Sequence, residues 1–288
     1  MGQGALKKLA GVLAVVGVAA VGAQWALLPR HTVGPCTLIA GPLSLPDLPE
    51  TSGLALGMRD PSLLWSQNDS GHEADIFAID ATGALRGRVR VPVAARDWED
   101  ISAGMCDAGS CLYIADIGDN RLTLPSVRIH RVPEPSPDDR ETATPVTFTA
   151  TYDDGAHNAE AMFLVGRQAY IVTRDREGAL YRATLGDAGD VVFRRVGALG
   201  LGAVTDAETS RDGQTVAVRT SHEVVLYRTT DLTEGRTTPR QRIPINALHE
   251  AQGEGVALDG TTLYLSSEGR MWNRPGRLLS LQCALEHE

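Results

Sequence analysis

An internal repeat constrains the fold of this chain more than any other feature. A short strand that opens on small or acidic residues recurs as TSGLALG at 51, WEDISAG at 98, AEAMFLV at 159, TDAETS at 205 and GEGVALDG at 253. Each interval reads as short alternating runs separated by turn residues, which is typical of four short strands. Four-stranded units at a period of about 40 to 50 residues predict an all-β fold, a β-propeller. The aligned positions, at steps of 47, 61, 46 and 48 residues, are Ser52, Glu99, Glu160, Asp206 and Glu254.

The number of units and the way the ring closes also follow from the repeat. The last unit supplies only three strands of its own, GVALD, LYLSS and RLLSLQ. The segment TLIAGPLSL, directly after Cys36, can supply the missing outer strand and remove an exposed sheet edge. We therefore predict five four-stranded blades closed by an N-terminal strand. Six blades remain the alternative if the long second unit, with its surplus at residues 133–145, hides another.

The first 30 residues are a targeting segment rather than part of the fold. Lys7 and Lys8 precede an apolar run over residues 9–28, which Pro29 and Arg30 close. Such a run is either a signal peptide or an uncleaved anchor, and its length of about 20 residues favours the anchor. Both alternatives place residues 31–288, a single propeller domain, outside the cytoplasm. We therefore expect an extracytoplasmic protein that is exported or tethered by one N-terminal transmembrane segment.

Export makes disulfides the expected state of the four cysteines. Cys106 and Cys111 flank a predicted turn and can meet across it. Cys36 and Cys283 lie next to the two segments that should pair to close the ring. The predicted bonds are therefore Cys36–Cys283 and Cys106–Cys111. Zinc is the rival interpretation, but the spacings contain no CxxC pair.

The overall charge narrows the classes of partner. The formal net charge is −9 at pH 7, and both lysines lie in the N-terminal segment. This sign disfavours nucleic acid and favours cations or basic surfaces, although solubility alone would also explain it. We expect a monomer that contacts the membrane only through its N-terminal segment and binds a small molecule, a glycan or a protein.

Acidic residues gather on one predicted face of the propeller. The segment RDWEDISAGMCDAGSCLYIADIGDN is expected to form a hairpin with strands at residues 98–105 and 111–115, with acids at both open ends. Such a group of carboxylates is stable only if it binds a cation, holds protons or pairs with arginine. Calcium suits oxygen-rich loops better than zinc does. The predicted metal ligands are Glu99, Asp116, Asp119, Glu160, Asp206 and Glu254.

Other side chains on the same loops are candidates for contact with a ligand. Arginines can steer or pair with negative charge, and tryptophans can supply apolar or sugar-stacking contacts. His157 and His249 are the candidates for a general base. The predicted ligand-binding residues are Asp69, Asp97, Trp98, Arg174, Arg219 and Trp272.

The strand openings SGLA, EDIS and EGVA resemble those of exported bacterial propellers of the SdiA-regulated and esterase-like phytase type. The motifs DWEDI and DIGDN are similar to those of a group of largely uncharacterised secreted propellers. This resemblance covers most of residues 45–288. It implies a calcium-dependent or calcium-stabilised fold, a phosphoester or ester hydrolase as one activity, and Glu99, Asp100 and Glu254 as acidic channel positions. Two features depart from the pattern of these propellers. The fourth unit reads DAETS, and the predicted number of blades is five.

Two functions follow. The first is a non-catalytic binding platform with an acidic, calcium-binding face, which the lack of a GxSxG nucleophile motif favours. The alternative is a metal-dependent hydrolase of a phosphoester, ester or lactone, in which a histidine acts as general base and an arginine steers the anionic substrate.

Overall fold

The computed structural model describes residues 32–269 and 274–286 of the chain. The described residues from Val33 onward form one compact unit that is almost entirely β-structure. The helices described are short, namely α2 (Thr229–Thr233) and the 3-10 turn η2 (Asn246–Leu248). No helix in the described ranges is long and apolar enough to cross a bilayer. The predicted N-terminal segment and Trp272 lie outside the described residues.

The first unit is an antiparallel meander in chain order. It consists of β3 (Thr51–Leu56), β4 (Leu63–Asn68), β5 (Asp75–Asp80) and β6 (Leu85–Arg90). The two innermost strands are buried along their whole length, whereas most residues of β6 are exposed or half-buried. Burial on both faces explains why the inner strands are nearly continuous runs of apolar and small residues, while β6 carries three arginines.

The second and third units share one eight-stranded sheet. Its two meanders are joined because the outer strands β10 and β14 pair in parallel, from Ala150 opposite Val191 to Tyr152 opposite Phe193. The surplus at residues 133–145 is, beyond the last residue of β9, the loop between β9 and β10. The strands are β7 (Trp98–Cys106), β8 (Gly109–Asp116), β9 (Val127–Pro133), β10 (Val146–Tyr152), β11 (Ala159–Val165), β12 (Gln168–Thr173), β13 (Ala179–Thr184) and β14 (Val191–Ala198).

The last two units complete the ring. The fourth holds β15 (Val204–Thr209), β16 (Thr215–Thr220), β17 (Glu223–Arg228) and β18 (Gln241–Pro244). The fifth holds β19 (Gln252–Asp259), β20 (Thr262–Glu268) and β21 (Gly276–Cys283), and it is extended by β2 (Cys36–Leu45) and the short β1 (Thr32–Val33). The strand β2 pairs antiparallel with β21, so the segment after Cys36 does supply the outer strand.

Both predicted disulfides are present. Cys36 lies directly opposite Cys283 in the β2–β21 register, and the two are bonded. Cys106 and Cys111 are bonded across the tip of the β7–β8 hairpin. The second bond crosses the ladder diagonally, because Cys111 is opposite Gly104 in the register.

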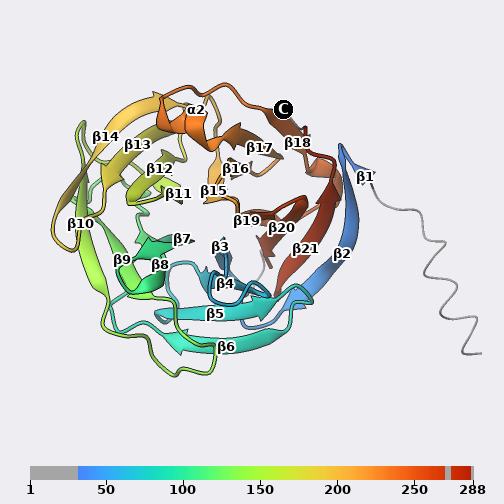
Figure 1. Ribbon diagram of the computed structural model, residues 1–288, viewed down its shortest axis with the longest axis horizontal. Helices are drawn as coiled ribbons and strands as arrows, with labels where there is room; N and C mark the ends of the chain where they lie inside the picture. The colour runs from blue at the N-terminus through green and yellow to red at the C-terminus, as the bar shows by residue number, and fades with distance from the viewer. Residues whose placement is uncertain (1–31, 270–273, 287–288) are drawn as a thin grey trace, which may run out of the picture. The chain divides into compact units, whose positions relative to one another are not determined.

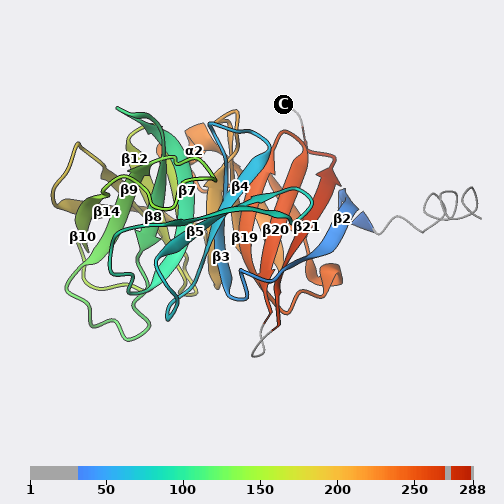
Figure 2. The same ribbon diagram turned by 90° about the horizontal axis from the view of Figure 1, so that it is seen from below.

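The hydrophobic core is divided among the spaces between neighbouring meanders. Five buried clusters lie between consecutive units, and one of them joins the last unit to the first through residues such as Leu278 and Leu54. Figure 1 shows the meanders arranged radially, with β3, β7, β11, β15 and β19 nearest the centre. Seen from the side in Figure 2, strands such as β3, β19 and β20 run through the thickness of the ring. This arrangement is a β-propeller.

Candidate functional site

Each of the five innermost strands begins with an irregularity in its pairing. The register shifts lie at Ser52/Ala55, Trp98/Asp100, Ala159/Ala161, Val204/Asp206 and Gly253/Val256. A bulge leaves a residue unpaired, bends the strand and re-aims side chains, and bulges are common beside functional sites. The five shifts therefore mark one end of the inner strands as the place where side chains depart from simple alternation.

The same contacts recur between neighbouring inner strands and fix which residues are equivalent. Oδ2 of Asp100 accepts a hydrogen bond from the amide of Met162, two residues after Glu160, at 2.6 Å. Oδ2 of Asp206 accepts the corresponding bond from the amide of Val256, two residues after Glu254. Asp206 is therefore the counterpart of Asp100, and the residue before it, Thr205, is the counterpart of Glu99.

The predicted alignment of the fourth repeat is thus wrong by one residue. The hydroxyl of Thr205 donates to the carbonyl oxygen of Glu254, as the hydroxyl of Ser52 donates to that of Glu99. The side chain of Asp206 is fully buried, and it lies beside Asp100 and Val256 rather than at the strand opening. The shift could not be detected from the sequence, because Asp206 directly follows Thr205 in TDAETS and is acidic like Glu99 and Glu254.

Three carboxylates from two neighbouring units converge at the strand openings. Asp69 directly follows β4, Asp97 directly precedes β7, and Glu99 is the second residue of β7. One oxygen from each lies within 4.8 Å of the other two. We call these three residues the acidic cluster. Of the predicted site residues, the structure brings together two ligand-binding candidates and one metal-binding candidate.

The motif DIGDN has a direct role beside the acidic cluster. The amide of Gly118 donates to the carbonyl oxygen of Asp97 at 3.3 Å. A Cβ atom on Gly118 would overlap Oε1 of Glu99 and Oδ2 of Asp97. Only glycine leaves room for both carboxylates at this point. The sequence pattern pointed to the motif but not to this residue.

Burial and mutual repulsion disfavour the charged form of these acids. Glu99 is 5% exposed, and burial, followed by the charge of Glu160, raises its pKa well above the usual value. Burial also raises the pKa of Asp97 and of Asp69. Within residues 32–269 and 274–286, no hydrogen bond or ion pair engages the side chain of Glu99. Burial and the neighbouring charges therefore favour the protonated form of this carboxyl group.

Three further glutamates surround the acidic cluster. Glu160 forms an ion pair with Arg174, yet burial still raises its pKa. Burial raises the pKa of Glu254 to about 8 and that of Glu268 to about 7. Glu268 was not predicted, although it ends β20 in the segment SSEGR on the same face. Neutralisation by arginine, one of the three ways in which these acids could be stabilised, is thus observed at Glu160.

Two predicted metal ligands have other partners. Asp116 is fully buried, lies 2.9 Å from Nη2 of Arg128, and accepts the amide of Asp97 at 2.9 Å. Asp119 accepts the amides of Thr123 and Leu124 at 3.1 and 2.8 Å, and so closes its own loop. Neither residue belongs to the acidic cluster.

Two predicted ligand-binding residues are parts of the core. Trp98 is 2% exposed and packs with the cluster between the first and second units. Arg219 is fully buried; its Nη1 donates to the carbonyl oxygens of Gly255 and Ser266 at 2.7 and 3.0 Å, and it forms an ion pair with Glu250. Both side chains are covered by protein, so neither is available to a ligand.

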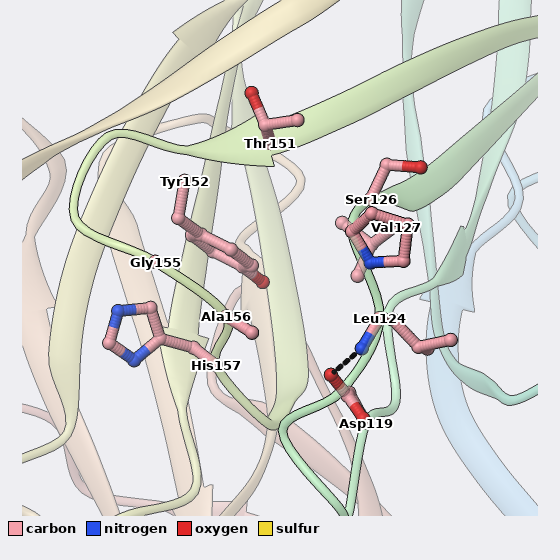
Figure 3. A pocket seen from close by; sticks show the side chains of 10 residues that line it. Asp119, Leu124, Ser126, Val127, Thr151, Tyr152, Gly155, Ala156 and His157 are labelled. Atoms are coloured by element: carbon pink, nitrogen blue, oxygen red, sulfur yellow. Dashed lines mark hydrogen bonds between the residues drawn. The ribbon is translucent and has the colours of Figure 1, made fainter.

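The two candidate general bases line different cavities. His157 bonds to Asp154 and Tyr181, each at 2.8 Å, and borders a cavity of about 230 Å³ together with Tyr152 and Asp119 (Figure 3). His249 borders a cavity of about 480 Å³ that also includes Arg174. Because Arg174 pairs with Glu160, the cavity at His249 adjoins the acidic face.

A second, deeper group of acids lies along the inner strands. Burial, and then the charge of Asp206, raises the pKa of Asp100 well above its usual value, while burial raises the pKa of Asp206 to about 7. The two carboxyl groups lie close enough for each to affect the pKa of the other. Glu208, two residues further along β15, is 3% exposed. Glu208 was not among the residues predicted from the sequence, although its spacing from Asp206 places both on one side of the strand.

Comparison with known proteins adds a likeness of fold. No protein-family model matches the chain, and no curated protein matches it. The solved glutaminyl cyclase of Myxococcus xanthus is similar, with a TM-score of 0.52 and 13% identity over 89% of this chain and 100% of that one. A gluconolactonase from Xanthomonas campestris aligns with a TM-score of 0.49 and 10% identity over 90% of this chain and 99% of that one. At such identities, the likeness to the cyclase extends to the fold alone.

Proposed function

We propose that this protein is an exported, membrane-tethered β-propeller whose acidic cluster binds a divalent cation, calcium, and uses it to hold a ligand or partner. The observation that carries the proposal is the position of Glu99. Its carboxyl group is buried, faces Asp69 and Asp97 within 4.8 Å, and has no partner among the described residues. An ionisable group left in this state is costly unless a cation or a proton neutralises it.

The donor atoms support calcium rather than a transition metal. All three groups of the acidic cluster are carboxylates, and two of them lie on loops that can adjust to an ion. Calcium takes six to eight oxygen ligands in flexible geometry, whereas zinc favours nitrogen and sulfur. The resemblance to exported bacterial propellers, carried by the strand openings and by DWEDI and DIGDN, implies a calcium-dependent or calcium-stabilised fold and points the same way.

The proposed number of blades and the proposed location outside the cytoplasm rest on the sheet topology and on the two disulfides. We infer five blades, because five hydrophobic clusters separate five groups of antiparallel strands and the parallel β10–β14 pair joins only the outer edges of the second and third groups. Two disulfides favour an oxidising, extracytoplasmic compartment. The apolar N-terminal run remains the proposed signal peptide or anchor.

Isothermal titration with calcium tests the proposal directly. The chain, stripped of metal with EDTA, should bind about one calcium ion, and Glu99→Gln should weaken binding by at least about tenfold. Glu234→Gln is the matched control, because Glu234 is an exposed glutamate beyond α2. An unchanged affinity in Glu99→Gln, or no calcium binding by the wild type, would reject the site.

A metal-dependent hydrolase of a phosphoester, ester or lactone is the second candidate. It is favoured by the cavity of about 480 Å³ that holds His249 and Arg174 beside the acidic face. There a histidine could act as general base while Arg174 attracts an anionic substrate. A panel of such substrates, assayed with calcium and with EDTA, should show turnover that His249→Gln abolishes. If no substrate in the panel were turned over, the hydrolase would be rejected and the non-catalytic binding platform would remain.

A further inference from the structure

The cavity beside His157 shares no lining residue with the cavity at His249. Its volume is about 230 Å³ (Figure 3), and its walls are the loop between β8 and β9, the start of β9, the end of β10 and the loop that follows β10. Drug-sized ligands occupy cavities of about 300–1,000 Å³, whereas each molecule of liquid water takes up about 30 Å³. The cavity therefore has room for a molecule that is larger than one water and smaller than a drug.

The walls of this cavity are fixed by contacts within the protein. Oδ1 of Asn158 accepts a hydrogen bond from the amide of Asp119 at 2.8 Å and so ties the two loops together. The ring of Tyr152 packs edge-on against His157 and Tyr181, with centroids 5.1 and 5.0 Å apart. A ligand that enters such a preformed cavity has little protein structure to order, which favours binding.

The hydroxyl group of Tyr152 is left unsatisfied in this cavity. Tyr152 is 9% exposed, and its Oη has no hydrogen-bond partner within residues 32–269 and 274–286. Figure 3 shows the hydroxyl end of the ring pointing between Ala156 and the loop that carries Asp119 and Leu124. Buried polar groups in native proteins are nearly always hydrogen-bonded, so a donor without a partner calls for an explanation. A bound molecule with an acceptor atom would supply the partner.

Asp119 restricts the charge of that molecule. Its carboxylate accepts the amides of Thr123 and Leu124 at 3.1 and 2.8 Å, and it forms no ion pair in the part of the chain that the structure describes. Hydrogen bonds from amides stabilise the charged form without a cation, and the oxygens can still accept a further donor. The negative charge would repel an anionic acceptor, and an ammonium group cannot accept a hydrogen bond from Tyr152. A neutral hydroxyl group can accept from Tyr152 and donate to Asp119.

We propose that this cavity binds a small neutral alcohol with a compact apolar body. Its hydroxyl group lies between Tyr152 and Asp119, accepting a hydrogen bond from the first and donating one to the second. Its apolar part lies against the side chains of Leu124, Val127 and Ala156, which also line the cavity.

Four probes that share one six-membered ring test both hydrogen bonds by isothermal titration with the full chain at pH 7. Cyclohexanol can accept and donate, cyclohexanone can only accept, cyclohexylammonium can only donate, and cyclohexanecarboxylate is an anion. We expect cyclohexanol to bind about two- to tenfold more tightly than each of the other three, the usual effect of one hydrogen bond. Tyr152→Phe should weaken the binding of cyclohexanol and cyclohexanone by a similar factor and leave that of cyclohexylammonium unchanged.

The stability of the ligand-free protein gives a second readout. Tyr152→Phe removes a buried hydroxyl group that has no partner, so the urea midpoint should stay constant or rise. Tyr181→Phe is the matched control, because the hydroxyl of Tyr181 bonds to Asp154 and His157, each at 2.8 Å, and its loss should lower the midpoint. If Tyr152→Phe lowered the midpoint as much as Tyr181→Phe, the hydroxyl of Tyr152 would already be paired and the proposal would be wrong.

A third variant covers the case in which Tyr152→Phe does not fold. The larger side chain of Ala156→Leu should occupy the cavity and abolish the binding of cyclohexanol. Ala188→Leu, at an exposed position between β13 and β14, should keep the wild-type affinity. Equal affinities of the four probes, tighter binding of either charged probe, no binding of cyclohexanol, or binding that survives Ala156→Leu would each overturn the proposal. None of these outcomes bears on calcium, because no residue of the acidic cluster lines this cavity.

Discussion

The backbone amide of Asp97 donates a hydrogen bond to Oδ1 of Asp116, with 2.9 Å between the two atoms. Burial raises the pKa of Asp116, but the contact with His130 and the bond from Asp97 outweigh it, so the net pKa is lowered. Asp116 therefore stays ionised and holds the loop that carries Asp97. It is a positioning residue for the acidic cluster rather than one of its members.

Replacing Asp116 with asparagine should separate positioning from ligation. Asparagine can still accept the amide of Asp97 but loses the ion pair with Arg128, so we expect a loss of about 1–3 kcal/mol in the free energy of unfolding. Calcium affinity should fall much less than in Glu99→Gln. Urea unfolding and calcium titration measure the two effects.

Asp75→Asn is the matched control, because Asp75 is a buried aspartate that pairs with Arg88 in the first unit. It should lower stability without changing calcium affinity. If Asp116→Asn weakened calcium binding as strongly as Glu99→Gln, Asp116 would be a ligand after all.

Gly118→Ala should damage the acidic cluster through volume alone. The new methyl group would overlap the carboxylates of Glu99 and Asp97, and these must move apart. We expect calcium affinity to fall by at least about tenfold, the usual effect of displacing supporting groups of a metal site. Gly186→Ala is the control, since a Cβ there meets nothing within 4 Å. Equal calcium affinities of the two variants would contradict the proposed geometry.

Stability in EDTA should fall as pH rises from about 4 to about 8. Burial raises the pKa of Asp206 and Glu268 to about 7 and that of Glu254 to about 8, so over this range the folded chain binds more protons than the unfolded chain. Stability then decreases with pH, because its slope follows the protons bound in the unfolded state minus those bound in the folded state. Urea midpoints at several pH values measure this slope.

A substitution and an added ligand should each weaken the dependence of stability on pH. Asp206→Asn removes one titrating group, and calcium replaces protons at the acidic cluster, stabilising the fold at pH 8 by about 2.7 kcal/mol at a hundred times its dissociation constant. A midpoint in EDTA that is constant or rises between pH 4 and pH 8 would show that these acids are ionised in the folded chain.

The two disulfides should contribute unequally to stability. Cys36–Cys283 closes a loop with a sequence separation of 247 residues, and Cys106–Cys111 one of 5. The chain-entropy model assigns about 5 kcal/mol to the first and about 2 kcal/mol to the second. Urea unfolding of Cys36→Ser/Cys283→Ser and Cys106→Ser/Cys111→Ser, each against the wild type, measures both. A larger loss from the second pair would show that closure through β2 is not the main constraint.

The sequence by itself determined the repeat, most strand positions and the way the chain returns on itself. Alternation of side chains and turn residues are local signals, so the meander of the fourth unit and the hairpin from Trp98 to Asp116 could be predicted from them. The pairing of β2 with β21 was also predictable, because an incomplete last unit and two terminal cysteines required the same contact.

Only the tertiary structure decided which acids meet. A bulge changes which of two successive side chains faces the axis, and its position depends on how five inner strands pack around that axis. The contacts of Asp100 and Asp206 with the next inner strand show that Thr205, not Asp206, matches Glu99. The acidic cluster itself combines Asp69 from one unit with Asp97 and Glu99 from the next, a contact that no local pattern contains.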